Sequence, residues 1–589
     1  MLNYTPEHLN FIQSLQPPPP KENPDSPAIT LAVLSDFSSQ HLVIILKNLF
    51  LLNNVNAEIY AAEYDAIEAN VYDPMSELYK TNPRFILILN STQKLRDRFW
   101  ERDADPKKFI LSETDRILNI WSAIQKQTNA SIIQTNFVLP HERLYGNHDA
   151  ANPISFQSSI SQINRVISET ILSQQGIYFN DLEYIASYYG KKNWFDEKLW
   201  IQFKYPCSLD LLPHLAQSLV DSVLSLNGFG VKCIVLDLDN TLWGGIIGEE
   251  GLSNIRLGHL RDGESFQLFQ KYLLALKNRG IILTVCSKNE IETALLPFRE
   301  HPDMILKEDD ITLFIANWES KVKNIQKIKE TINIGYDSII FLDDSPFERS
   351  LVKDNLPDVI VPDLPTDPSN YIKTLSELNL FESAVISTAE STRTQWYRDE
   401  FKRRSHEDNF INHDDYLKSL EMKITLARFD NFQIPRIVEL LQRSNQYNLM
   451  TKRFNESECV KFMNSPEYLP FYIELTDKYG DNGLISVVIL KLESRKIKIL
   501  EWAMSCRVLN RGVEKQAMNS IFTLAKTKQA AHVSGEYIPT LKNALVKNFY
   551  KEFGFEQMEF SDGKSQTWEL PCQKYIPKRV FFQTATVKI

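Results

Sequence analysis

Short apolar runs alternate with stretches of helical periodicity along the first part of the chain. Apolar runs at residues 28–34, 57–61 and 84–89 predict strands, and the segments between them carry apolar positions at helical spacing. Strands that alternate with helices favour a parallel sheet covered by helices. We expect this first α/β domain to span residues 29–228, closing after a helical stretch at 211–225.

A second series of apolar runs begins at Val231 and predicts another α/β domain at residues 229–380. The run from Cys233 to Leu236 is apolar throughout, which is typical of a central strand buried on both faces. The expected elements are strands 233–236, 281–286, 338–342 and 359–361, connected by helices 264–278, 290–298 and 321–331.

The remaining segments differ from these two domains in their pattern. Residues 1–28 predict a short helix and then a stiff linker, because prolines cluster at 17–20. Residues 381–419 are polar and predict a connecting helix. Residues 420–589 predict an α+β domain, with strands at 423–427, 472–475, 483–491 and 496–502, and helices at 434–443, 513–526 and 541–549. The expected fold class is therefore α/β multidomain.

The bulk composition excludes several classes of protein. The 589 residues are 43% hydrophobic and 24% charged, as in globular proteins, and allow three or four domains of ~100–200 residues. A formal net charge of −10 argues against a general nucleic-acid-binding protein. No apolar run approaches the ~20 residues of a membrane span, and the N-terminus lacks a signal-peptide pattern. Six cysteines without metal-ligand spacing favour reduced thiols and a cytoplasmic location.

Polar side chains suited to catalysis follow the strands of the second domain. In chain order they are Asp237, Asp239 and Thr241, then Ser287 and Lys288, then Lys321 at the start of a helix, and finally Asp343 and Asp344. The carboxyl ends of parallel strands meet at one edge of an open sheet, so we expect these side chains to lie together. One pair of acids at a strand end is often only a polar turn, whereas four such signals in order indicate a site.

This set of side chains suits phosphoryl transfer to a carboxylate nucleophile. Asp237 would attack phosphorus to form an aspartyl phosphate, and Asp239 would protonate the leaving oxygen and then activate the incoming nucleophile. Mg²⁺ would be held by Asp237, by the backbone carbonyl of Asp239 and by an acid of the 343–344 pair. The expected ligands of the phosphoryl oxygens are Thr241, Ser287, Lys288 and Lys321.

The four motifs resemble those of the haloacid dehalogenase (HAD)-like superfamily, which implies a phosphatase with a Rossmann-like parallel sheet. Asp237 and Ser287 are 50 positions apart, and Ser287 and Lys321 are 34 apart. Neither interval has room for a cap domain. The resemblance therefore implies a capless enzyme with an open site, which suits a large substrate or one covered by the neighbouring domains.

Longer stretches resemble the FkbH-like subgroup of that superfamily. They include LDLDNTLWGGIIGEEG, CSKN, NWESK and FLDDSPFER, and, outside the central domain, FVLPHERLYGN, RSNQYNLMTKRF, DKYGDNGLISVVIL and SCRVLNRGVE. The resemblance implies an enzyme of polyketide or related secondary-metabolite biosynthesis. Such an enzyme takes 1,3-bisphosphoglycerate, removes phosphate and loads a glyceryl unit onto the phosphopantetheine thiol of an acyl carrier protein. It also implies that Asp237 is the nucleophile, Asp239 the acid/base, and Asp344, with Asp343 nearby, a metal ligand.

The outer domains resemble two other enzyme folds. Residues 29–228 are similar to a degenerate SGNH hydrolase, in which Ser35 follows the first strand but the expected Gly-Asp-Ser and the catalytic His are missing. A structural or docking role is the expectation there. Residues 420–589 resemble a GNAT acyltransferase, with Tyr550 placed to protonate a leaving thiolate. The residues of its expected turn for the phosphate of coenzyme A or pantetheine are Arg507, Asn510, Arg511 and Gly512, with Asn510 in place of a glycine.

Two cysteines are candidates for an enzyme thioester. Cys506 directly precedes the anion-binding turn, where positive potential lowers the pKa of a thiol, and Cys286 lies beside Ser287. A free cysteine is more often a small buried residue. Three functions therefore stay open: a glyceryl-loading enzyme, a phosphatase acting on a carrier-bound or small phosphorylated substrate without acyl transfer, and a non-catalytic scaffold of a biosynthetic complex. The intact acids argue against the scaffold.

Overall fold

The computed structural model describes most of the chain in two compact units. The described residues are 10–18, 28–101, 105–259, 262–383, 403, 406–407, 410, 412–444, 447–505, 508–540, 543–558 and 565–589. One unit ends at Leu226 and includes Asn455–Glu458, and the other holds Asn227–Phe454 and Cys459–Ile589. The expected linkers at 1–28 and 381–419 fall mostly outside the described residues. Within the described part, no helix has the length and apolar character of a membrane span.

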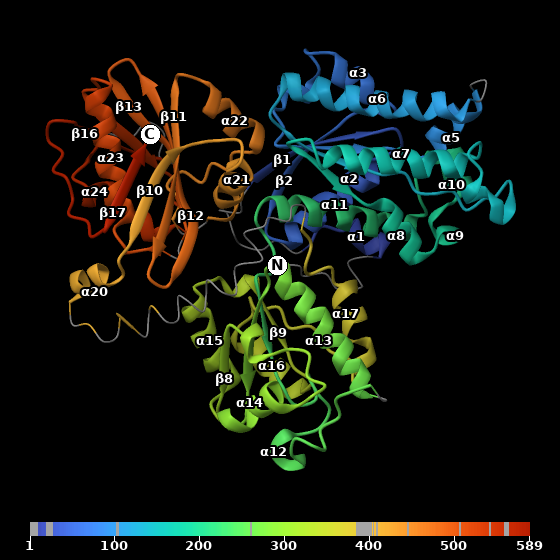
Figure 1. Cartoon of the computed structure of the whole chain (residues 1–589). Helices are drawn as coiled ribbons and strands as arrows, with labels where there is room; N and C mark the ends of the chain where they lie inside the picture. Colours follow the sequence, from blue (N-terminus) through green and yellow to red (C-terminus); the bar gives the residue numbers. More distant parts are fainter. Residues whose placement is uncertain are drawn as a thin grey trace. The chain divides into compact units, whose positions relative to one another are not determined.

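The first unit is built on a five-stranded parallel sheet with the order β2-β1-β3-β4-β5. Its strands are β1 (Ala28–Ser35), β2 (Asn56–Ala61), β3 (Phe85–Leu89), β4 (Ser131–Thr135) and β5 (Ile177–Asn180). The helices of eight or more residues are α2 (Gln40–Leu52), α5 (Thr92–Glu101), α6 (Pro106–Gln127), α7 (Phe156–Ile171), α8 (Leu182–Tyr189) and α11 (Leu212–Leu226). Helix α2 packs against α11 and α6 packs against α7, on opposite faces of the sheet (Figure 1). The predicted parallel α/β fold is confirmed, and β4 and β5 extend it.

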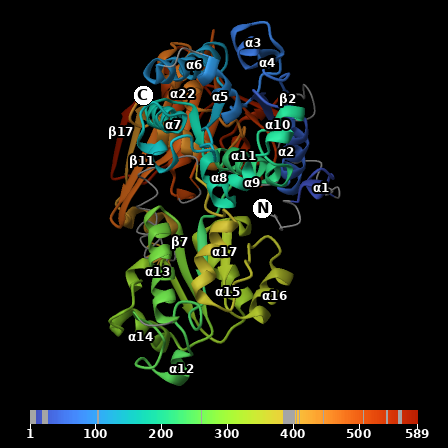
Figure 2. The ribbon, with the colours of Figure 1, turned by 90° about the vertical axis from the view of Figure 1, so that its right-hand side faces the viewer.

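A four-stranded parallel sheet with the order β8-β7-β6-β9 lies in the second unit. Its strands are β6 (Cys233–Leu236), β7 (Ile282–Ser287), β8 (Leu313–Ala316) and β9 (Ile339–Leu342). Its helices are α12 (Ile247–Glu250), α13 (Asp262–Asn278), α14 (Ile291–Glu300), α15 (Lys321–Ile332), α16 (Pro346–Asn355) and α17 (Tyr371–Glu377). Helix α13 packs against α17, and α15 packs against α16 (Figure 2). Every residue of β6, β7 and β9 is buried, as their apolar sequences predict.

Two features of this sheet differ from the sequence prediction. Strand β8 was not predicted, and its four residues are only half-buried because it lies at the edge of the sheet. The strand expected at 359–361 is reduced to a single bridge between Ile340 and Ile360. Both segments are short apolar runs, Leu313–Ala316 and 359–361, and the apolar character of so short a run does not decide whether it pairs as a strand.

An eight-stranded sheet with the order β15-β16-β14-β13-β12-β11-β10-β17 completes the second unit. Its strands are β10 (Lys423–Arg428), β11 (Tyr468–Asp477), β12 (Gly480–Glu493), β13 (Lys496–Met504), β14 (His532–Tyr537), β15 (Glu556–Gln557), β16 (Gln566–Pro571) and β17 (Thr584–Lys588). Its helices are α20 (His413–Ser419), α21 (Ile434–Arg443), α22 (Glu456–Asn464), α23 (Val513–Thr527) and α24 (Phe549–Glu552). Neighbouring strands are antiparallel except in the pairs β13/β14 and β10/β17. The predicted α+β pattern is present, although the helix expected at 541–549 is a 3-10 turn followed by α24.

Candidate active site

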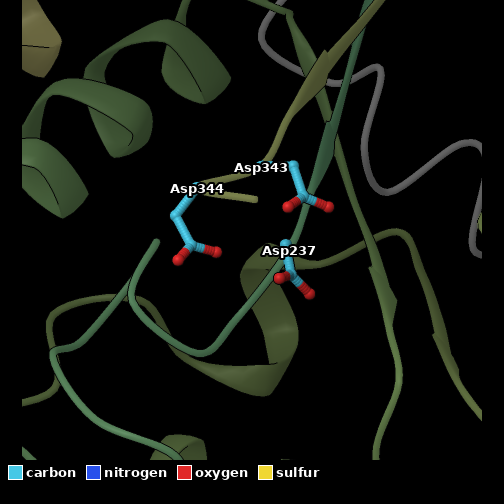
Figure 3. A group of neighbouring side chains, drawn as sticks. All are labelled: Asp237, Asp343 and Asp344. Atoms are coloured by element: carbon cyan, nitrogen blue, oxygen red, sulfur yellow. The ribbon is translucent and has the colours of Figure 1, made fainter. Parts of the chain in front are cut away.

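Three carboxylates meet at the carboxyl edge of the four-stranded sheet. Asp237 directly follows β6, and Asp343 and Asp344 directly follow the neighbouring strand β9, with which β6 is in register at Leu236 and Leu342. One oxygen from each acid lies within 4.8 Å of the others. Figure 3 shows the three side chains turned toward the same region. The apolar strands end where these acids begin, so the register of the buried sheet positions the acids.

A buried lysine joins two of these acids. Lys321, the first residue of α15, places Nζ 2.9 Å from Asp237 Oδ1 and 2.5 Å from Asp343 Oδ2. Burial opposes the charge of the lysine, but the two carboxylates outweigh it and raise the pKa of Lys321 above its ordinary value. The ammonium therefore stays protonated and can attract the oxygens of a phosphoryl group.

The charges of this cluster do not balance. Burial and the charge of Asp237 raise the pKa of Asp343 and of Asp344, against the opposing effect of Lys321. Three ionised carboxylates and one ammonium leave two negative charges in a buried position. A divalent cation would neutralise them, and carboxylate oxygens are the ligands that Mg²⁺ prefers. The residues present therefore fit a Mg²⁺ ion held by Asp237, Asp343 and Asp344.

The loop that carries Asp343 and Asp344 is held by residues that the sequence prediction missed. The backbone N–H of Ser345 donates to Asp343 Oδ1 at 2.9 Å. Arg349 donates from Nη1 to the carbonyl oxygens of Asp343 at 2.8 Å and Asp344 at 2.7 Å. Arg349 is buried on the first turns of α16. Arg349 lies five positions after Asp344, on the helix that begins at Pro346. This spacing is the feature of the sequence from which its role could have been predicted.

Asp239 is held by three donors, two from the segment that follows it and one from the loop after β7. Its Oδ1 accepts from Trp243 Nε1 at 2.9 Å and from the N–H of Ile247 at 3.0 Å, and its Oδ2 accepts from Asn289 Nδ2 at 2.9 Å. Burial and the charge of Asp237 outweigh these donors and raise the pKa of Asp239. A fixed carboxylate with a raised pKa suits a group that must both give and take a proton. Trp243 and Asn289 were not predicted as positioning residues.

A tight turn at Asn240 directly follows Asp237 and Asp239. Asn240 has a φ of +54°, which asparagine tolerates better than most residues, and its side chain accepts from the N–H of Gly245 at 2.8 Å. The hydroxyl of Tyr371 donates to the carbonyl of Asn240 at 3.0 Å. Thr241 is fully buried, and its Oγ1 has no partner among the described residues. This turn keeps Thr241 beside the acids, where its hydroxyl was predicted to bind phosphate.

The two residues predicted beside β7 lie in different surroundings. Ser287 is the last residue of β7 and is buried at the carboxyl edge, one strand from Asp237. Lys288 is exposed, and its Nζ lies 2.6 Å from Oε1 of Glu348 on α16. The structure therefore brings Lys321 into contact with Asp237 and Asp343 and places Asp344 within 4.8 Å of these two acids, whereas Lys288 is engaged by a carboxylate.

The two candidate thiols have different outcomes. Cys286 is buried in the apolar core around β6, β7 and β9, and burial raises the pKa of its thiol to about 12. Such a thiol does not ionise near neutral pH, so this position does not fit a nucleophile. Cys506 and Arg507 lie outside the described residues, and their predicted roles stay predictions.

The rest of the expected pantetheine-binding turn is described. Asn510 has a φ of +61° and Gly512 a φ of +80°, directly before α23. Arg511 is buried and lies 3.5 Å from the carboxylate of Asp477, so its charge is engaged within the fold. Tyr550 is buried, and burial raises the pKa of its phenol well above the ordinary value. The predicted roles of Asn510, Arg511 and Gly512 in binding pantetheine stay predictions.

The parallel sheet and the acids at its carboxyl edge define a phosphatase domain of the HAD type. A family model described as FkbH, N-terminal domain, matches residues 30–224. A solved structure described as the N-terminal part of the protein BF1531 from Bacteroides fragilis, containing a phosphatase domain and complexed with Mg, is 37% identical to the chain. That match covers 61% of this chain and 95% of that one, with a TM-score of 0.58. The chain belongs to the FkbH-like family.

Solved acetyltransferases are also similar to part of the chain. The ribosomal-protein-S18-alanine N-acetyltransferase from Escherichia coli is 14% identical over 25% of this chain and 94% of its own, with a TM-score of 0.21. A spermidine/spermine N-acetyltransferase SpeG from Vibrio cholerae is 16% identical over 26% and 95%, with the same TM-score. These similarities do not decide an activity for residues 420–589. No curated protein matches the chain.

Proposed function

We propose that this chain is a Mg²⁺-dependent enzyme that removes phosphate from 1,3-bisphosphoglycerate and loads the glyceryl unit onto the phosphopantetheine thiol of an acyl carrier protein. The observation that carries the phosphatase part is the grouping of Asp237, Asp343 and Asp344, with Lys321 between two of them. The Mg of the related Bacteroides fragilis protein supports the choice of metal. Membership of the FkbH-like family and the motifs along the chain support the glyceryl part.

The ester phosphate is removed in two steps at the acids. Asp237 attacks phosphorus with a carboxylate oxygen, the bond from phosphorus to the ester oxygen breaks, and Asp239 gives that oxygen its proton. Water then attacks the aspartyl phosphate at phosphorus while Asp239 takes its proton, and phosphate leaves with Asp237 restored. Mg²⁺, when bound, supplies positive charge that offsets the repulsion between the carboxylate and the phosphate. Lys321 adds a fixed positive charge and orients Asp237.

The acyl phosphate of the same substrate provides the energy for loading. A thiolate attacks the acyl carbon, the carbon–oxygen bond to phosphate breaks, and phosphate leaves with the electron pair. One 1,3-bisphosphoglycerate, one carrier thiol and one water thus give one glyceryl thioester and two phosphates. The anion-binding turn before α23 is the expected site for the pantetheine phosphate or for coenzyme A.

A phosphatase without acyl transfer is the second candidate, and one observation favours it. All five cysteines among the described residues are buried: Cys207, Cys233, Cys286, Cys459 and Cys572. An enzyme thioester would therefore require Cys506, or the carrier thiol would have to attack the acyl phosphate directly. Because the described thiols are buried, none of them provides a further position for an enzyme thioester.

Intact-mass analysis separates the two candidates. The protein is mixed with 1,3-bisphosphoglycerate, Mg²⁺ and a phosphopantetheinylated carrier, and both the released phosphate and the carrier mass are measured. A carrier that gains a glyceryl group supports loading, whereas phosphate release with an unmodified carrier would exclude it. Asp237→Asn should abolish removal of the ester phosphate under either reading, and Cys506→Ala should stop loading only if that cysteine carries a thioester.

A further inference from the structure

Strands β13 and β14 are paired over only part of their length, and we call the place where they separate the strand gap. The two strands are parallel, and Lys496–Ile499 pair with His532–Gly535. Strand β13 continues to Met504, just before the turn expected to bind the pantetheine phosphate. A pantetheine arm held by its phosphate at that turn would run along β13 in the strand gap, where its amide groups could pair with the edge of the strand.

The chain's own residues 447–450 occupy this edge of β13, and we call them the closing segment. The N–H of Met504 donates to the carbonyl oxygen of Tyr447 at 2.9 Å. The N–H of Leu449 donates to the carbonyl oxygen of Trp502 at 3.2 Å. The closing segment therefore uses the backbone groups of β13 that a pantetheine amide would need.

The opposite side of the closing segment is bonded to the chain that follows β14. The N–H of Ile538, directly after β14, donates to the carbonyl oxygen of Leu449 at 3.0 Å. The buried amide of Asn543 donates to the carbonyl oxygens of Asn448 at 3.0 Å and Ile538 at 2.9 Å. The closing segment is thus bonded on both sides of the strand gap, as an additional strand would be.

The closing segment belongs to the core of the domain. Asn448 and Leu449 are fully buried and Met450 is 1% exposed, and the two apolar side chains are part of the main apolar cluster of the domain. Just beyond the segment, the N–H of Lys452 donates to Oε2 of the buried Glu501 at 2.8 Å. Displacement of the segment would expose apolar surface and break buried hydrogen bonds, so a ligand is unfavourable in its place.

Tyr550, which was expected to protonate a leaving thiolate, is enclosed behind the same residues. Its side chain is buried, and its hydroxyl lies so close to Gly535 that a side chain at that position would collide with it. The ring of Phe549 contacts both Tyr550 and Tyr447, with centroids 5.4 and 5.8 Å apart. A proton donor must come within hydrogen-bond distance of its thiolate. The buried Tyr550 hydroxyl does not fit this role.

We propose that the closing segment takes the place of pantetheine in the strand gap, so that the carrier thiol is acylated outside this gap and without Tyr550. This inference rests on the proposed function, which requires a phosphopantetheine thiol, and it restricts where that thiol reacts. The turn before α23 can then hold a phosphate only with the pantetheine arm outside the sheet. Direct attack of the carrier thiol on the acyl phosphate requires no group of the strand gap.

Amide hydrogen exchange of the full-length protein tests the closed gap, with an excess of coenzyme A as the probe. Peptides that cover residues 447–452 and 500–505 should exchange slowly without coenzyme A, and at the same rate with it. Faster exchange of 447–452 when coenzyme A is added would show that the ligand displaces the closing segment, and this would overturn the proposal. Rapid exchange of both peptides in the free protein would overturn it as well.

The variant Tyr550→Phe tests the second part of the proposal, because it removes only the hydroxyl. It should load the phosphopantetheinylated carrier within about twofold of the wild-type rate. Tyr575→Phe, which removes another buried hydroxyl from the same core, is the matched control. A loss of loading by about tenfold or more in Tyr550→Phe alone, with the variant folded by circular dichroism, would contradict the proposal.

Failure of the proposed function has a different signature. A wild type that releases phosphate but does not load the carrier would refute the loading reaction. The exchange experiment with coenzyme A needs no loading, so it decides whether the strand gap is closed in either case.

Discussion

Replacement of Lys321 by methionine tests the electrostatic account of the site most severely. Methionine has a similar volume, but it removes the ammonium that lies 2.9 Å from Asp237 and 2.5 Å from Asp343. All three side chains are at least nine-tenths buried, so the two carboxylates would face each other without compensation. Loss of one partner from a buried ion pair costs ~3–5 kcal/mol, and we expect the free energy of unfolding without Mg²⁺ to fall by that amount.

The same substitution should separate metal binding from catalysis. The ammonium repels a cation held at the acids, and relief of only ~1.4 kcal/mol of that repulsion corresponds to a tenfold gain in affinity. Lys321→Met should therefore bind Mg²⁺ about tenfold more tightly or better, and Mg²⁺ should restore much of its lost stability. Phosphate release should nevertheless fall ~10²–10³-fold, because a fixed positive charge for the phosphoryl group is lost.

Calorimetry of the full chain measures the loss of stability from the unfolding transition in EDTA. It measures the Mg²⁺ affinity from the shift of that transition when Mg²⁺ is added. Lys327→Met is the matched control on α15, because Lys327 pairs with Glu319 where both side chains are about half exposed. Exposed pairs contribute roughly 0–1 kcal/mol, so this variant should keep both stability and activity. Weaker Mg²⁺ binding by Lys321→Met, or a stability loss no larger than that of the control, would refute the reasoning.

Two other predictions follow from single contacts. Asn289→Ala should lower phosphate release about 10–100-fold with an unchanged Mg²⁺ affinity, because the amide orients Asp239 and is not hydrogen-bonded to an acid of the metal cluster. Steady-state kinetics and a Mg²⁺ titration measure the two quantities. Normal phosphate release by this variant would exclude the positioning role. Burial raises the pKa of Asp36 from 3.8 to about 6, so the folded first unit holds a proton that the unfolded chain releases. Its stability should therefore fall by about 3 kcal/mol as pH rises from about 4 to about 6. Thermal unfolding across this range should show the fall in the wild type and not in Asp36→Asn, and a flat wild-type profile would contradict it.

The central sheet could be predicted from the sequence because its strands are buried on both faces. The runs at β6 and β9 are apolar along their whole length, the run at β7 is interrupted only by Thr284 before its last residue, and each run ends at or just before a chemically distinctive residue. Strand β8 escaped prediction although its four residues, LFIA, are all apolar, because so short a run does not by itself distinguish a strand from other buried segments. The acids and Lys321 could then be predicted to lie together, because the carboxyl ends of parallel strands share one edge of the sheet.

The supporting residues could not be predicted because their partners are distant in the sequence. Asn289 reaches Asp239 across 50 positions, and Tyr371 reaches Asn240 across 131. Only the folded chain shows that Lys288 is held by Glu348, or that Cys286 points into the core. Residue type indicated what these side chains could do, whereas burial and partners decide which of them can do it.

The role of Asp237 as the nucleophile is the central claim, and acid-quenched mass spectrometry tests it directly. The full-length protein is mixed with 1,3-bisphosphoglycerate and Mg²⁺, quenched within the first turnover, digested and analysed for peptides that carry a phosphoryl group. We expect one such peptide, phosphorylated at Asp237, sensitive to hydroxylamine and missing from Asp237→Asn. Removal of the ester phosphate at the wild-type rate by Asp237→Asn, or a phosphoryl group on a different residue, would contradict it.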